Sequence, residues 1–532
     1  MQEVKPEDLT LEQKIGQMML VGFPSAHIDA HFTELAEGCL AGNIILFTRN
    51  VEGREQLAAL LDDIQKQVMK NTAVPAFTAV DQEGGMVARL RREATHLPGN
   101  MAFSASGAEA TYRAGEITGI ELRALGINMN LAPVLDVNNN PGNPGIGVRS
   151  YGDDPARVAA YGAAYIRGLQ ENGVIAAAKH FPGKGDCEVD AHIGLPSIEH
   201  GMERLEKVEL LPFCHAIECG VGAIMTSHVL FPSIEKQRIP ATMSESIQTD
   251  LLRRKMGFDG IRITDCMEMK AIADHFGTVE ATVASIKAGA DLVCVCHTLE
   301  VQKRCVEAVK KAVSDGVIPL QRIDAAVGRI LSAKTRYGLF ESCTPDMRKV
   351  RSVVGCAEHK QFARSISEKS ITLVKDERGL LPVRRGERLM TISTEAVTLT
   401  GAEDSDRSET FCECVKKRLG GDSLTIPLEP GSDAIAGIAA RTAGYDKVIL
   451  ATYNAMFNKG QAELVNKILQ VNQNVIAVSL RVPYDIIRYS RVPAYICAYE
   501  YTALSVDSVI RVLEGGAAEG CLPVKIDCVR EG

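Results

Sequence analysis

Residues 179–196 read KHFPGKGDCEVDAHIGLP and concentrate titratable side chains in a segment interrupted by glycine and proline. Such a segment is too rich in glycine for a helix and too polar for a buried strand, so we expect a loop. Asp190 and His192 stand two positions apart, and side chains at this spacing face the same side of extended backbone. The carboxylate of Asp190 can then accept a hydrogen bond from one ring nitrogen of His192, which leaves the other nitrogen free to exchange a proton with a substrate.

A single carboxylate, Asp265, follows the apolar run IRIT at 261–264. Together with Asp190 and His192, it predicts a reaction in which one carboxylate attacks while a second group acts as acid and then as base. Retaining glycosidases divide the work in this way, with histidine here replacing the usual second carboxylic acid. Other polar side chains are suited to hydrogen-bonding and orienting sugar hydroxyls. They are Asp81, Arg89, Arg149, Lys179 and His180.

A metal centre is the main alternative for the same loop. His180, Asp186, Asp190 and His192 are all residue types that bind metal ions in hydrolytic sites. Such barrels usually need a second histidine cluster near the first strand, and LVGFPS at 20–25 offers none. We therefore expect no metal and no cofactor, while a metal-dependent hydrolase or lyase stays open as an alternative, as does a solvated loop without function.

The loop must be positioned by the eight short apolar runs that alternate with amphipathic helical segments before residue 300. Continuous apolar strands separated by helices indicate a parallel sheet buried on both faces. Eight such units predict an α/β fold of the (β/α)8 TIM-barrel type. A doubly wound sheet is the rival, but MLVGFPSAH does not match the phosphate loop that it would need. The runs are 16–23, 42–47, 75–82, 129–137, 174–181, 223–231, 260–267 and 290–297.

Ionisable side chains fall at or near the carboxyl ends of six of these runs. Barrel strands converge at this end, where active sites form, so we expect these side chains on one face. Exposed strand ends also accumulate polar residues, which would account for any single member without a function. The set comprises Asp81, Asp136, Lys179 with His180, His228, Asp265 and His297.

The chain is long enough for more than one domain. We expect a catalytic barrel over 1–341, a polar connector over 342–386 and a smaller C-terminal α/β sandwich domain over 387–532. The last domain lacks a comparable cluster of ionisable groups, so we expect it to pack against the barrel or shape its cleft. Glu500, at the end of a predicted strand, is an outside candidate for an alternative acid.

The net charge and the amino-acid composition indicate which classes of partner and ligand the protein can bind. The 532 residues carry a net charge of −8, which disfavours nucleic acids and anionic membranes as partners. The start MQEVKPEDLT lacks the apolar stretch of a signal peptide, and the 15 scattered cysteines are typical of free thiols, so we expect a cytoplasmic protein. With no tryptophan, any sugar ligand should be short and held by polar contacts.

The segment KHFPGKGDCEVDAH resembles the K-H-F-P-G-x-G-D-x-x-x-D-x-H signature of the β-N-acetylglucosaminidase branch of family 3 glycoside hydrolases. Segments such as VDQEGGMVARL and GFDGIRITDCMEM agree in order, and together the similarity covers residues 8–340. The resemblance implies Asp265 as nucleophile, His192 as acid/base and Asp190 as its partner. It implies sugar binding by Asp81, Arg89, Arg149, Lys179 and His180.

The remainder of the chain resembles the family less closely. SITLVKDERGLLPV and LRVPYDI are similar to the second domain of two-domain members. Lys184 stands where relatives often carry histidine, and Cys266 stands where an acidic or small residue is common. Neither departure removes a catalytic group, although Lys184 changes the charge of the loop.

These patterns predict a retaining exo-β-N-acetylglucosaminidase that removes terminal N-acetylglucosamine from short glycans, such as the muropeptides of peptidoglycan recycling. The expected partner is a small carbohydrate substrate, with no nucleic acid and no membrane. A β-N-acetylglucosaminide phosphorylase is a close alternative, because a histidine acid/base adds no negative charge that would repel inorganic phosphate. A metal-dependent barrel enzyme and a non-catalytic sugar-binding protein represent other classes.

Overall fold

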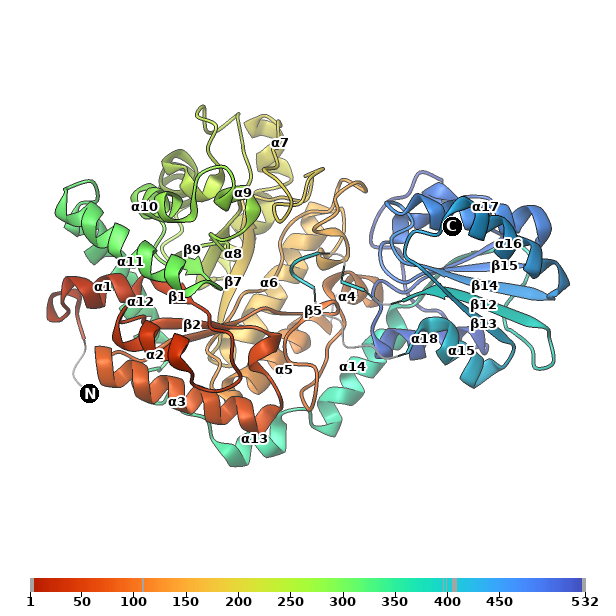
Figure 1. Ribbon diagram of the computed structural model, residues 1–532, viewed down its shortest axis with the longest axis horizontal. Coiled ribbons are helices and arrows are strands. Elements are labelled where there is room, and N and C mark those ends of the chain that lie inside the picture. The colour runs from red at the N-terminus through yellow and green to blue at the C-terminus, as the bar shows by residue number, and fades with distance from the viewer. Residues whose placement is uncertain (1–3, 108–109, 396, 399, 404–408, 529–532) are drawn as a thin grey trace.

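The computed structural model describes residues 4–107, 110–395, 397–398, 400–403 and 409–528. Figure 1 shows two units, a larger barrel unit coloured red to green and a C-terminal unit coloured teal to blue. Helix α14 (Ala357–Ser370) runs between them and packs against α4 (Asn100–Ser106) of the barrel unit and α18 (Ala503–Leu513) of the C-terminal unit.

Eight parallel strands form the sheet of the barrel unit, in the order β10-β1-β2-β3-β6-β7-β8-β9. They follow one another in chain order around the sheet, and a bridge between Ile263 and Leu292 links the two end strands. The predicted (β/α)8 barrel is confirmed as a nearly closed barrel. The strands are β1 (Met19–Val21), β2 (Asn43–Leu46), β3 (Phe77–Val80), β6 (Met129–Asn130), β7 (Ile175–Phe181), β8 (Ala223–Thr226), β9 (Ile261–Thr264) and β10 (Val293–Val295).

The helices around the barrel are amphipathic. In α3 (Arg54–Thr72), for example, Leu57, Leu61, Ile64 and Val68 are buried at the three- and four-residue spacing of one helix face. The other main helices are α1 (Leu11–Gln17), α2 (Ala30–Glu37), α5 (Ala110–Leu125), α6 (Pro155–Glu171), α7 (Met202–Lys207), α8 (Leu211–Glu218), the π-helix Ser246–Lys255, α9 (Lys270–Ala273), α10 (Thr278–Ala288), α11 (Leu299–Ser314) and α12 (Leu320–Arg336).

The C-terminal unit contains a six-stranded sheet in the order β11-β16-β15-β14-β12-β13, in which β11 runs antiparallel to β16 and the other pairs are parallel. Its strands are β11 (Thr372–Asp376), β12 (Leu389–Thr394), β13 (Asp422–Ile426), β14 (Lys447–Thr452), β15 (Val475–Ser479) and β16 (Ala494–Cys497). Helices cover the sheet and bury an apolar cluster on each face. They are α15 (Phe411–Leu419), α16 (Ser432–Arg441), α17 (Lys459–Val471) and α18.

The two units share apolar packing. Met101 and Ala102 of α4, together with Val148, join the buried cluster that lies mainly in the C-terminal unit. The segment 342–386 contains helix α13 (Met347–Val353), helix α14 and strand β11. Its last element therefore belongs to the C-terminal sheet. None of the helices that the structure describes combines the length and the apolar character needed to cross a lipid bilayer.

Candidate active site

A cavity of about 470 Å³ lies at the carboxyl ends of the barrel strands. Seven of the eight predicted site residues line it, and the eighth, Asp190, contacts His192 directly. The structure therefore brings the whole predicted set together, although their chemical roles remain predictions. The lining members are Asp81, Arg89, Arg149, Lys179, His180, His192 and Asp265.

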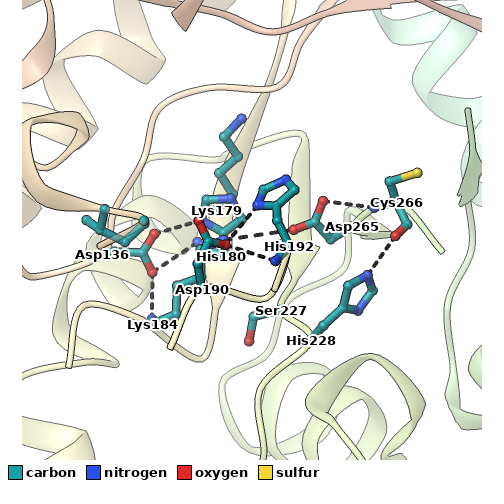
Figure 2. A network of polar contacts seen from close by, with 12 residues as sticks. Asp136, Lys179, His180, Lys184, Asp190, His192, Ser227, His228, Asp265 and Cys266 are labelled. Carbon is teal, nitrogen blue, oxygen red and sulfur yellow. Dashed lines mark hydrogen bonds and ion pairs between the residues drawn. The ribbon is translucent and has the colours of Figure 1, made fainter. Parts of the chain in front are cut away.

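Asp190 and His192 form a hydrogen-bonded pair at the edge of this cavity (Figure 2). Oδ1 of Asp190 lies 2.8 Å from Nδ1 of His192 and also accepts the backbone N–H of His192 at 3.0 Å. Burial alone would raise the pKa of Asp190, but the hydrogen bonds and charge of His192, with the charge of Lys184, hold it far below its ordinary value. An ionised Asp190 places a proton on Nδ1 and leaves Nε2 for exchange with a ligand.

Asp265 follows strand β9 and is largely buried, with 17% of its side chain exposed. Its Oδ1 accepts the backbone N–H of Cys266 at 2.8 Å. Burial favours the protonated form, but the charges of Lys184, His228 and His192 lower the pKa of Asp265 below its usual value. The carboxylate is therefore ionised at neutral pH, as a nucleophile must be.

A network of buried ion pairs forms the wall next to β3 and β7. Lys179 Nζ lies 2.7 Å from Asp81 and 2.6 Å from Glu83. Glu83 also binds Arg149 through two hydrogen bonds of 2.7 and 2.9 Å. Burial would raise the pKa of Glu83, but Arg149 and Lys179 lower it to about 2. The network holds Asp81, Lys179 and Arg149 in fixed positions around the cavity.

Sequence reasoning missed Glu83. It lies in the short strand β4 (Gln82–Gly84), which pairs with β5 (Val87–Ala88) beyond the end of β3. Its spacing of two residues from Asp81 was the available signal, since such a pair can face the same side of extended backbone.

His180 is oriented by a buried carboxylate. Its Nδ1 lies 2.7 Å from Oδ2 of Asp136, and Oδ1 of Asp136 accepts the backbone N–H of Lys184 at 2.7 Å. Burial and the nearby cations Lys184 and Arg149 hold the pKa of His180 well below its ordinary value. The neutral ring donates from Nδ1 to Asp136, so Nε2 is an acceptor for a ligand hydroxyl.

Other candidates have structural partners. His228 is buried between the hydroxyl of Thr242 and the carbonyl of Cys266, each at 2.9 Å, and so supports the segment after Asp265. Asp186 lies 2.5 Å from Nε2 of His200. Of the four residues considered as metal ligands, Asp190 and His192 contact each other, while His180 pairs with Asp136 and Asp186 with His200. No group of three or more His, Cys, Asp or Glu side chains in the described ranges is arranged to hold a metal ion.

The C-terminal unit also reaches the cavity. Gly401, Ala402 and Glu403 line it, and Arg89 Nη1 donates to the carbonyl of Ala402 at 2.7 Å. Glu500, the outside candidate for an acid, does not belong to this lining. It is buried between the units, where its Oε2 accepts the backbone N–H of Gly99 at 2.7 Å.

Comparisons with known proteins agree with this geometry. Residues 10–333 match the family model described as the glycosyl hydrolase family 3 N terminal domain. The chain is 28% identical to a β-hexosaminidase A of Pseudoalteromonas piscicida, over 98% of this chain and 97% of that protein. It is 29% identical to a β-N-acetylglucosaminidase/β-glucosidase of Cellulomonas fimi, over 97% and 94% respectively. A solved family 3 β-N-acetylglucosaminidase from Paenibacillus sp. str. FPU-7 superposes with a TM-score of 0.91 at 39% identity, covering 97% of this chain and 99% of that one.

Proposed function

We propose, because the chain belongs to glycosyl hydrolase family 3 and is a glycoside hydrolase, that it is a retaining exo-β-N-acetylglucosaminidase. The observation that carries the proposal is the placement of Asp265 and the Asp190–His192 pair at one cavity. A cavity of about 470 Å³ suits a short ligand better than a long polysaccharide.

In the first step, the ionised carboxylate of Asp265 attacks the anomeric carbon of the bound sugar. The imidazolium of His192 gives its Nε2 proton to the departing glycosidic oxygen, and the ionised Asp190 stabilises the imidazolium until then. In the second step, the now neutral His192 takes a proton from water, and this water attacks the anomeric carbon and releases Asp265. Two inversions at one carbon give overall retention.

The ion-pair network supports sugar binding. Asp81 and Lys179 can accept and donate hydrogen bonds to adjacent hydroxyls, while the neutral His180 offers Nε2 as an acceptor. Because Glu83 and Asp136 already fix these side chains in the free protein, little side-chain freedom is lost when the sugar binds.

We further propose that the natural substrate is a muropeptide fragment handled in the cytoplasm during peptidoglycan recycling. Arg49 and Lys270 line the cavity beside the catalytic groups. Two cationic side chains at this place favour an aglycone that bears carboxylates, as fragments of this class do.

The test is turnover of an aryl β-N-acetylglucosaminide by the wild-type protein and by Asp265→Ala. We expect the variant to lose turnover completely, because the glycosyl-enzyme cannot form. A near-normal rate for Asp265→Ala would end the nucleophile assignment. The corresponding aryl glucoside is the matched substrate, and we expect it to react more slowly than the N-acetylglucosaminide.

A phosphorylase is the second candidate, favoured by the charge around the nucleophile. Lys184 Nζ lies 4.0 Å from Oδ2 of Asp265, and the acid/base is an imidazole instead of a carboxylate. A phosphate oxygen attacking the glycosyl-enzyme would meet less repulsion here than beside a second carboxylate. N-acetylglucosamine 1-phosphate formed in phosphate buffer would favour this activity, and its absence at high phosphate would exclude it.

A further inference from the structure

A short segment of the C-terminal unit, residues 400–403, stands directly against the imidazole of His192. A β-carbon added to Gly401 would lie 2.7 Å from Cδ2 and 3.2 Å from Nε2 of this ring. The ring therefore occupies the space that a side chain at position 401 would need. The φ angle of Gly401 lies outside the left-handed region, so close contact with His192, rather than backbone conformation, is what excludes a side chain.

A buried ion pair anchors the 400–403 segment. Arg481 donates from Nε to Oε1 of Glu403 at 3.1 Å, and its Nη2 donates to the same oxygen. Both side chains are fully shielded from solvent. Arg481 directly follows Leu480, whose N–H donates to the carbonyl of Thr452 at the end of β14. The ion pair thus joins the segment to the C-terminal sheet.

The barrel unit contacts the residues next to both members of this ion pair, Ala402 beside Glu403 and Val482 beside Arg481. Arg89, held near Asp81 in the cavity, donates to the carbonyl of Ala402 at 2.7 Å. Next to Arg481, Val482 lies against Gly147, where an added β-carbon would stand 3.1 Å from its Cγ1. Gly147 begins the turn that carries Arg149. The segment and its anchor are therefore seated against residues that line the sugar cavity.

The loop that carries His192 exposes two apolar side chains to solvent. Its neighbours Val189 and Ile193 are exposed by 43% and 72%. Asp190 contacts the ring at Nδ1, so the edge formed by Cδ2 and Nε2 lies opposite this contact. The 400–403 segment contacts this opposite edge, at Cδ2 and Nε2.

We propose that the ion pair between Glu403 and Arg481 holds the 400–403 segment against His192 and thereby positions Nε2 for proton transfer to the leaving group. Glu403, Arg481 and Gly401 are positioning residues for the acid/base, supplied by the C-terminal unit. The inference rests on the proposed role of His192 as acid/base, and it assigns to the second unit a task in the chemistry itself.

The decisive variant is Gly401→Ala, which adds one methyl group where the ring of His192 now lies. Displacing Nε2 should lower kcat for a glycoside with a poor leaving group by roughly 10- to 100-fold, since general acid catalysis contributes about 10²–10⁴-fold. With a dinitrophenyl leaving group, which needs little protonation, the first-step rate should change by less than about threefold. Gly437→Ala in α16 is the matched control, because its β-carbon would meet nothing within 4 Å.

Two further variants test the anchor. Glu403→Gln and Arg481→Met should reproduce the leaving-group dependence of Gly401→Ala, with thermal unfolding recorded to confirm that each protein is folded. Should Arg481→Met fail to fold, Gly401→Ala and Glu403→Gln still decide the question. An equal loss on all substrates, or no loss in Gly401→Ala, would overturn the proposal.

His192→Ala separates this inference from the proposed function. If His192→Ala shows strong leaving-group dependence and Gly401→Ala does not, the positioning role is wrong while the acid/base assignment stands. If His192→Ala itself lacks the dependence, the assignment of the acid/base fails, and the positioning role fails with it.

Discussion

The ammonium group of Lys184 lies 4.0 Å from Oδ2 of Asp265, and each side chain is at least four-fifths buried. The backbone fixes Lys184, whose N–H donates to Asp136 and whose carbonyl accepts from Asn143. The charge of Lys184 therefore acts on the carboxylate of Asp265 from a fixed backbone position. Lys184, which stands where relatives often carry histidine, is thus a direct electrostatic neighbour of Asp265, the proposed nucleophile.

Replacing Lys184 with methionine should move the acid limb of the kcat/KM–pH profile to higher pH. In the proposed mechanism Asp265 must be ionised to attack, and the charge of Lys184 lowers the pKa of Asp265. Removing the charge raises this pKa, so a higher pH is needed to ionise the carboxylate. Lys184→Arg keeps the charge and should keep the limb near its wild-type position. An acid limb that is the same in Lys184→Met and wild type would contradict this reading.

His192→Ala should slow hydrolysis of a natural glycoside by about 10²–10⁴-fold and affect a dinitrophenyl glycoside far less. The reason is that a good leaving group departs without protonation, whereas a sugar alkoxide does not. The measurement is a plot of log kcat/KM against the pKa of the leaving group for both proteins. A slope in His192→Ala no steeper than in wild type would count against histidine as the acid.

Glu83→Gln should raise KM for the sugar and lower stability. The substitution leaves Arg149 and Lys179 buried without their shared carboxylate, and breaking a buried pair in this way costs about 3–5 kcal/mol of unfolding free energy. Urea unfolding and steady-state kinetics report the two effects. Glu203→Gln is the control, because its pair with Lys207 is exposed to solvent and should change neither quantity measurably.

Asp291→Asn should destabilise the barrel, most strongly near neutral pH. This carboxylate is fully buried and contacts four arginines, namely Arg253, Arg262, Arg322 and Arg329. Burial would raise its pKa, but the arginine charges lower it to about 2. Because the folded pKa lies below the ordinary value of about 3.9, its stabilisation is complete above that pH and is lost as the pH falls toward 2.

Chemical unfolding of wild type and Asp291→Asn at several pH values provides the measurement. We expect a gap of about 3–5 kcal/mol near pH 7 that narrows below about pH 4. A gap that stays constant down to pH 2 would mean that the loss comes from altered packing instead of the missing charge.

Much of the barrel could be predicted because its strands are buried on both faces and read as continuous apolar runs. Each of the eight runs contains a strand, and ionisable residues at the carboxyl ends mark the cavity. The strand in the fourth run, 129–137, is shorter than predicted, because only Met129 and Asn130 belong to it. Pro133 interrupts it, because proline has no N–H to donate to a neighbouring strand.

The site residues that could not be predicted from the sequence are positioned by tertiary contacts. Glu83 belongs to a short hairpin, and the residues that pair with it, Lys179 and Arg149, are distant in the chain. Gly401 and Ala402 carry no functional group that a motif could mark, and they reach the cavity because the C-terminal unit packs against the barrel unit. The hydrophobic periodicity of a sequence predicts which face of a single helix or strand is buried. The position of the 400–403 segment depends instead on how the barrel unit and the C-terminal unit fit together.

The hydrogen bond from Arg89 to Ala402 spans 313 positions of the chain. This contact between the barrel unit and the C-terminal unit limits which C-terminal units from related enzymes can be joined to the barrel in the laboratory. A chimera that joins this barrel unit to the C-terminal unit of another protein should still bind sugar. It should turn over poorly unless that unit also supplies counterparts of Gly401 and of the ion pair between Glu403 and Arg481. Laboratory selection for chimeras with exchangeable C-terminal units would therefore act first on this contact between the two units.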